Sequence, residues 1–209
     1  MSLIKRLIAA AILVTTLSSC SFGAEYSEEP AKRELPTDGE VADELSDMVQ
    51  MLTVNSPLLP EFEDIEDAME FCRDSVLFYM LAENYGKYSG NIEKLDAAVA
   101  EYPQMQITNL IPAREFEETV YTAFGGTRKI DNESGRLFIY LDKVAAYTSV
   151  TMLDTERVKV SILDLVETEN TYRMRVRCRA GDVESPEYRI IFVKREDGTA
   201  YFHSVEEAK

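Results

Sequence analysis

The sequence predicts an α+β fold in which N-terminal helices pack on one face of a curved antiparallel sheet. From about residue 41 to residue 124, apolar residues recur at the spacing of a helix, whereas from about residue 136 they alternate with polar residues as in a strand. Two-residue turn signals, Glu169-Asn170 and Asp197-Gly198, separate the later strands and favour hairpins. Helices followed by an antiparallel meander are typical of this fold class.

The helical part is predicted to contain helices at residues 41–52, 61–88, 92–101 and 112–124. The second of these has an inward stripe formed by Ile65, Met69, Cys72, Val76, Tyr79 and Met80. Its first turns carry Glu61, Glu63, Asp64, Glu66 and Asp67. The helix dipole explains this acidic run, so no metal site is predicted there. Asn91 can cap the third helix, and Gly125-Gly126 can end the fourth.

The later part is predicted to contain strands at residues 137–149, 157–168, 171–180, 187–195 and 199–205. Because side chains alternate across a strand, pairing these hairpins sorts the residues into two faces. The core face is predicted to hold Val158, Val160, Ile162, Tyr172, Met174, Val176, Cys178, Tyr188, Ile190, Phe192, Tyr201, His203 and Val205. The outer face is predicted to hold the arginines of residues 171–180 together with Leu163, Leu165, Ile191, Val193 and Phe202.

One predicted strand carries arginine at four alternate positions: Arg173, Arg175, Arg177 and Arg179. Such a row can be a solvated sheet face with acidic neighbours across the strands, for example Glu187 near Arg179. Alternatively, together with Arg189, it can be a docking surface for an acidic partner, a cell-wall polyanion or the acidic tether of the chain itself. We expect Arg177 to face Arg189, which would set two like charges against each other.

Motifs for catalysis are few. The chain has one histidine, His203, which excludes a histidine-rich metal site, and it has no Gly-rich phosphate loop, no G-x-S-x-G elbow and no CxxC pair. No metal and no cofactor are predicted. A single histidine near Phe192 and Tyr201 is usually a satisfied core residue. The alternative is that His203 acts as a general base in a small enzyme.

Two cysteines lie in the predicted domain, Cys72 and Cys178. An exported protein can join two cysteines in one disulfide. We favour two small buried thiols, because both positions fall on apolar faces.

The first twenty residues have the parts of an export signal. Lys5 and Arg6 precede an uncharged apolar run at 7–17, which is too short to span a bilayer. The run ends in Leu17-Ser18-Ser19-Cys20, which resembles the lipobox of bacterial lipoproteins. This resemblance implies that a diacylglycerol is attached to Cys20, that a peptidase cleaves before Cys20, and that the lipid holds the mature chain on the extracytoplasmic side of the membrane.

The remaining sequence suits one domain on a tether. Residues 1–19 are predicted to be the signal peptide, residues 20–40 a flexible acidic tether, and residues 41–209 a single domain. The formal net charge of −16 argues against nucleic acid as a partner, because phosphates demand basic surfaces. The partners that remain are the membrane through lipid on Cys20, an envelope protein, a small ligand, or a second copy bound through the outer sheet face.

A helical layer on one side of a curved meander resembles the nuclear-transport-factor-2-like fold, or cystatin-like cone. The resemblance covers roughly residues 61–206 and rests on the order of the elements. That fold is found in enzymes, ligand binders and interaction domains, so it implies no single function. The sequence as a whole predicts a non-catalytic binding or interaction module. A small enzyme that uses a cone-shaped pocket with His203 is the alternative.

Overall fold

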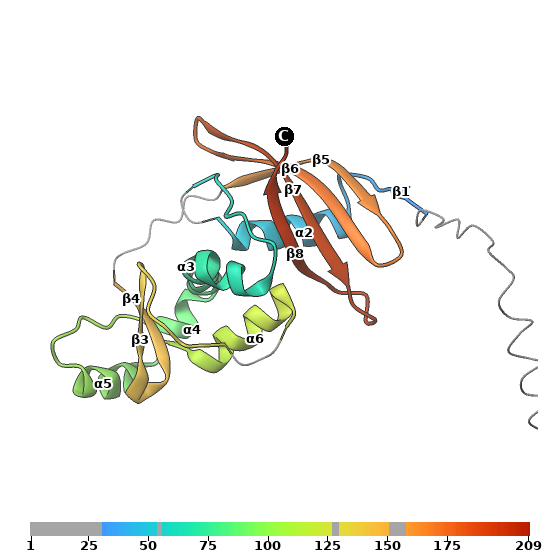
Figure 1. Ribbon diagram of the computed structural model, residues 1–209. Helices are drawn as coiled ribbons and strands as arrows, with labels where there is room; N and C mark the ends of the chain where they lie inside the picture. The colour runs from blue at the N-terminus through green and yellow to red at the C-terminus, as the bar shows by residue number, and fades with distance from the viewer. Residues whose placement is uncertain (1–30, 54–55, 127–129, 151–157) are drawn as a thin grey trace, which may run out of the picture. The chain divides into compact units, whose positions relative to one another are not determined.

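The computed structural model describes residues 31–53, 56–126, 130–150 and 158–209, and in them helices precede the long strands (Figure 1). Residues 32–209 form one compact unit. The predicted export signal and Cys20, the predicted site of lipid attachment, lie outside the described residues. Within these ranges, no helix is both long and apolar enough to cross a membrane.

The larger sheet is an antiparallel meander with the strand order β1-β5-β6-β7-β8. Its strands are β1 (Arg33–Glu34), β5 (Lys159–Glu167), β6 (Thr171–Ala180), β7 (Val183–Lys194) and β8 (Ala200–Glu207). The α+β prediction is therefore confirmed, as are the two predicted hairpins that join β5 to β6 and β7 to β8. Strand β7 begins earlier than predicted, and Pro186 lies inside it rather than at its start.

A second sheet has the order β2-β4-β3, with β2 at Ile111–Pro112, β3 at Phe138–Leu141 and β4 at Ala146–Ser149. The prediction of one long strand at 137–149 is wrong, because the chain turns back on itself in the middle. A single 3-10 turn, η1 (Asp142–Val144), is followed by Ala145 with a positive φ of 46°. This turn contains neither glycine nor proline, so the sequence gives no signal that predicts it.

The helices are α2 (Glu40–Met51), α3 (Ile65–Glu83), α4 (Tyr85–Ser89), α5 (Ile92–Glu101) and α6 (Ala113–Phe124). The predicted helix at 61–88 is shorter at one end and broken at the other. It begins after Asp64, whose carboxylate accepts hydrogen bonds from the backbone N–H groups of Glu66 and Asp67. It breaks at Asn84, whose φ and ψ of −130° and 35° are not helical. The caps predicted at Asn91 and Gly125 are confirmed.

The core lies between one face of the larger sheet and the helices α2, α3 and α6. Cys72 and Val76 on α3 and Val176 on β6 are fully buried in the same apolar cluster. Phe124 on α6 joins the cluster, with its ring centroid 5.4 Å from that of Phe202 on β8. Figure 1 shows α2 alongside the larger sheet and α5 beside β3 and β4. Helix α5 contributes Ala98 to a separate, smaller apolar cluster with Leu141.

The folded unit begins earlier than predicted. Strand β1 lies in the segment expected to be tether, yet Arg33 and Glu34 pair with the end of β5. The next residue, Leu35, donates a backbone hydrogen bond of 2.9 Å to Leu165 and packs against the core. The compact unit therefore begins near Lys32 rather than near residue 41.

The two cysteines of the domain are free and buried, as favoured from the sequence. Removal of each thiol from water raises the pKa of Cys72 and of Cys178 from 9.0 to about 12. Both groups are therefore protonated and unreactive at neutral pH in the folded chain.

Candidate functional site

The outer face of the larger sheet is the face turned away from the core, and its side chains are exposed or half-buried. Pairing in β6 places its arginines in register with residues of β5 and β7 on the same face. Arg173, Arg175 and Arg179 are exposed and Arg177 is half-buried. The prediction of a row of arginines on the outer face is thus confirmed.

The neighbours of this row differ from those predicted. Arg177 lies opposite Glu187, and it is Arg175 that lies opposite Arg189. The predicted pairing of Arg177 with Arg189 is therefore wrong by two residues along β6, which is one position on the same face. The expected pairing of Glu187 with Arg179 is also wrong, since Arg179 lies opposite Glu184.

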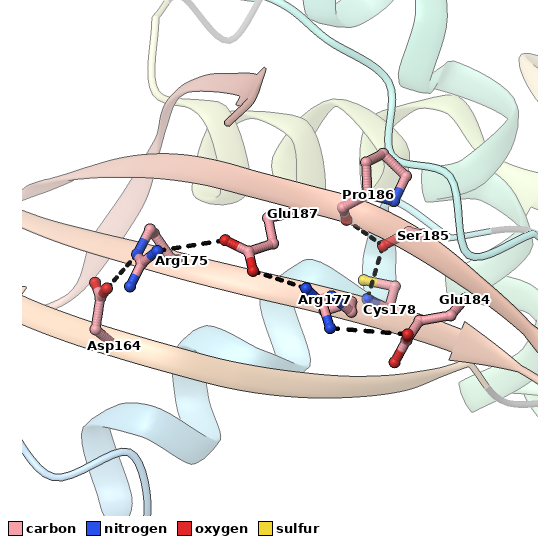
Figure 2. Close-up of polar contacts among 8 residues, drawn as sticks. All are labelled: Asp164, Arg175, Arg177, Cys178, Glu184, Ser185, Pro186 and Glu187. Atoms are coloured by element: carbon pink, nitrogen blue, oxygen red, sulfur yellow. Dashed lines mark hydrogen bonds and ion pairs between the residues drawn. The ribbon is translucent and has the colours of Figure 1, made fainter. Parts of the chain in front are cut away.

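A bulge and a tight turn cause this change of register. Residues Ala180 and Val183 pair directly, so Gly181 and Asp182 form a two-residue turn that was not predicted from the sequence. The register then shifts at Ser185, whose side chain turns inward and is 6% exposed. The Ser185 hydroxyl accepts a hydrogen bond from the Cys178 backbone at 2.9 Å and donates one to the Pro186 carbonyl at 2.6 Å (Figure 2). The bulge is thereby fixed by a local hydrogen-bond network.

Acidic side chains alternate with the central arginines. Figure 2 shows the continuous chain Asp164, Arg175, Glu187, Arg177 and Glu184. Glu187 joins the two arginines, with one carboxylate oxygen 2.7 Å from Arg177 and the other 3.3 Å from Arg175. The hydrogen bond with Asp164, together with its charge, raises the pKa of Arg175 above its ordinary value. This part of the row resembles the solvated face with cross-strand acids that was one of the two predicted alternatives.

The remaining arginines, Arg173 and Arg179 at the ends of the row and Arg189 on β7, differ in their ionic partners. Arg189 pairs with Glu206 at 2.7 Å, and Arg179 lies 3.8 Å from Asp182. By contrast, Arg173 is exposed and has no ionic or hydrogen-bonding partner among the residues that the structure describes. Its cross-strand neighbours are apolar: Val166 on β5 and Ile191 on β7.

Further apolar side chains on these strands are at least partly exposed. Val193 follows Ile191 two residues along β7 and is half-buried. Leu163, at the bulge of β5, is 39% exposed. The Arg173 patch, defined here as Arg173, Val166, Ile191 and Val193, therefore combines one unpaired cation with a small apolar surface. Groups of this kind are common in protein–protein contacts, where arginine and apolar residues are enriched.

Leu165, Phe202 and His203 are not oriented as predicted, because register shifts interrupt the alternation of side chains. Leu165 was expected on the outer face, but the register shift after Ile162 turns it into the core, where it is 2% exposed. Phe202 was expected outside and is likewise buried, because a register shift at Ile191 and Phe192 changes the phase of β8. The same shift moves His203 from the predicted core face to an exposed position.

His203 lines none of the three cavities that are described for residues 31–53, 56–126, 130–150 and 158–209. Within the same residues, no group of three histidine, cysteine, aspartate or glutamate side chains converges as a metal site would require.

The chain matches no protein-family model, no curated protein and no solved structure. The cone-like fold suggested by the order of the elements therefore remains a prediction.

Proposed function

We propose that the chain is an exported lipoprotein, anchored on the extracytoplasmic side of a membrane by lipid on Cys20, whose domain is a non-catalytic docking module. The anchor is supported by the basic start, the short apolar run and the lipobox-like Leu17-Ser18-Ser19-Cys20. The docking role is supported by the outer face of the larger sheet.

The observation that carries the docking role is the position of Arg173. The other arginines of β6, and Arg189, already have acidic partners, so their charges are largely compensated within the protein. Arg173 alone among these five lacks such a partner in the part of the chain that is described, and its neighbours Val166 and Ile191 leave apolar surface around it. The Arg173 patch thus has unused binding capacity for a carboxylate flanked by apolar groups.

The partner that fits this patch is a protein segment of the cell envelope with an acidic residue next to apolar ones. A carboxylate of the partner would form a charge-assisted hydrogen bond with Arg173, and apolar side chains would cover Val166, Ile191 and Val193. A long polyanion fits less well, because it would meet Glu184, Glu187 and Glu206 along the rest of the face. This proposal narrows the predicted docking surface from the whole arginine row to one end of it.

Site-specific crosslinking in the native envelope tests the docking role. A photoreactive amino acid is placed at Ile191 in one strain and at Lys159, at the opposite end of the same face, in another. We expect a crosslinked partner from position 191 and none from position 159, and Arg173→Ser in the first strain should abolish the crosslink. Equal products from both positions, or a crosslink unaffected by Arg173→Ser, would contradict the proposal. A product of twice the mass of the chain would identify a second copy as the partner.

The anchor is tested separately by mass spectrometry of the mature N-terminus. We expect cleavage before Cys20 and a lipid on its thiol, and we expect Cys20→Ser to abolish lipid attachment. Cleavage at another position with no lipid would overturn the anchor while leaving the docking proposal open to the crosslinking test.

A further inference from the structure

A cavity of about 570 Å³ lies beside the helical corner between α4 and α5, away from the outer sheet face. This volume falls within the range of about 300–1,000 Å³ typical of small-molecule sites. Its walls come from α4, α5, β2, the start of α6, η1 and β4. The side chains that line it include Lys87, Tyr88, Lys94, Leu110, Pro112 and Glu115.

One wall of the cavity is a fixed polar cluster. A single carboxylate oxygen of Glu115 accepts hydrogen bonds from the Lys87 ammonium at 2.6 Å and from the Tyr88 hydroxyl at 2.9 Å. Tyr88 is 5% exposed, and its backbone carbonyl accepts a hydrogen bond from Leu110 at 2.9 Å, which joins the polar wall to the apolar one. The charges of Lys87 and Glu115 therefore offset each other.

Lys94 gives the lining of this cavity a net positive charge. It is exposed on the first turn of α5, where its backbone N–H donates to the Asn91 side chain, and its ammonium has no acidic partner among the described residues. Desolvation by burial raises the pKa of Glu115, but hydrogen bonds from Lys87 and Tyr88 and the charges of Lys87 and Lys94 lower it overall. Lys94 is thus close enough to act electrostatically on the cavity wall.

Apolar side chains make up much of the remaining lining: Leu110, Pro112 and Val144, with the small side chains of Ala97 and Ala146. We infer that this cavity binds a small organic anion, with the carboxylate of the ligand on Lys94 and an apolar body against Leu110, Pro112 and Val144. Neither the proposed lipid anchor nor the proposed docking role requires such a site, so the inference stands independently of both.

A second cavity, of about 640 Å³, shares Lys87, Tyr88 and Glu115 as a wall and provides an internal comparison. Its additional charged residues are Glu44 and Glu118, so acidic groups outnumber its single lysine. A cation with an apolar body would suit that side better than an anion. The preference for an anion is therefore specific to the side that contains Lys94, and it is notable in a chain with 38 acidic and 22 basic residues.

Three probes of the same shape and different charge test this inference on the full-length protein: 4-fluorobenzoate, 4-fluorobenzyl alcohol and 4-fluorobenzylamine. Fluorine NMR titration reports the affinity of each. We expect the benzoate to bind most tightly to the wild type. Lys94→Met, which keeps most of the length of the side chain and removes the charge, should weaken the binding of benzoate about tenfold, as expected for the loss of one charge-assisted hydrogen bond. Lys159→Met, on the outer sheet face, should leave the affinity unchanged.

A second variant obstructs the cavity and leaves the charge of Lys94 in place. Ala97→Trp places a large side chain at an exposed position of the cavity wall and retains Lys94. We expect it to reduce the affinity for all three probes, whereas Lys94→Met should reduce it for benzoate alone. Thermal melting of both variants shows that they remain folded. The inference is overturned if benzoate and benzylamine bind the wild type equally, or if neither variant changes the binding of benzoate.

Discussion

Arg175 and Arg189 lie directly opposite each other on β6 and β7, and each guanidinium is bound by a different acidic side chain. Arg175 binds Asp164 and Glu187, whereas Arg189 binds Glu206 on β8. Like charges that face each other across strands destabilise a sheet unless they are offset. The acids on both sides therefore allow a row of arginines to exist without a bound anion.

Glu187→Gln tests how much this compensation contributes to stability. The variant removes the carboxylate that bridges Arg175 and Arg177, so the repulsion between arginines increases. Because the three side chains are between 31% and 45% exposed, solvent screens the interaction. We expect the free energy of unfolding in urea to fall by no more than about 1 kcal/mol, and the difference from wild type to shrink in 1 M salt.

The matched control for this experiment is Glu184→Gln, because Glu184 is 57% exposed and lies 3.8 Å from Arg177. Its effect should be smaller than that of Glu187→Gln. A loss of several kcal/mol for Glu187→Gln, unchanged by salt, would mean that the row is a structural network rather than a solvated face.

Ser185→Ala tests the bulge that sets the register of β7. The Ser185 hydroxyl is the acceptor for the buried backbone N–H of Cys178, so the variant leaves that donor unsatisfied. A lost partner for a buried donor costs about 1–3 kcal/mol. We expect a decrease of this size in the free energy of unfolding, measured by urea titration. Ser204→Ala, a half-buried position on β8, should cost less than about 0.5 kcal/mol. Equal losses would show that the hydrogen bond to Cys178 is unimportant.

Much of the fold could be predicted because its periodicity is regular. The α5 and α6 helices have clear caps, and the core face of β6 alternates without interruption from Met174 to Cys178. The turn at η1 could not be predicted in the same way, since its sequence contains neither glycine nor proline and depends on Ala145 adopting a left-handed conformation. Tertiary contacts fix that conformation, and local propensity does not reveal it.

The candidate sites were harder to predict, because they depend on register. The four arginines of β6 could be placed on one face, but a single-residue bulge near Ser185 decided which acids they meet. In the same way, the shift between Ile191 and Phe192 exposed His203. The cavity lined by Lys94 could not be predicted from the sequence, since Lys94 and Leu110 lie in different parts of the chain and no motif links them.

Val176→Asp tests the assignment of the two faces of β6. Val176 is fully buried and pairs with Ile162 and Tyr188, so an aspartate there would be charged and without a partner. We expect the variant to be unfolded at 25 °C by near-UV circular dichroism. Arg173→Asp, on the opposite face of the same strand, should remain folded with a nearly unchanged melting temperature. If both variants unfold, the Arg173 face is packed against something in the folded chain, and the docking proposal fails with it.

The last prediction concerns stability at alkaline pH. Burial raises the pKa of Cys72 and of Cys178 from 9.0 to about 12, so the unfolded chain releases these protons near pH 9 while the folded chain retains them. The unfolded state then binds fewer protons, and the free energy of unfolding must fall as the pH rises from about 9 toward 12. Below pH 9 the thiols are protonated in both states and have no such effect.

Buried tyrosines add to the same slope as the pH approaches 10, because burial also raises the pKa of Tyr88, Tyr147 and Tyr188 above the ordinary value of 10.0, so the thiol contribution is the difference between the wild type and a variant without the two cysteines. Each thiol contributes a decrease of up to about 1.4 kcal/mol per pH unit where the unfolded form is ionised. Urea titrations at pH 8, 9 and 10 measure this change in the free energy of unfolding. The double variant Cys72→Ala/Cys178→Ala should be less stable at pH 8 but should lose less stability between pH 9 and pH 10. A slope identical to that of the wild type would mean that the thiols ionise in the folded chain, and that one or both are accessible to solvent.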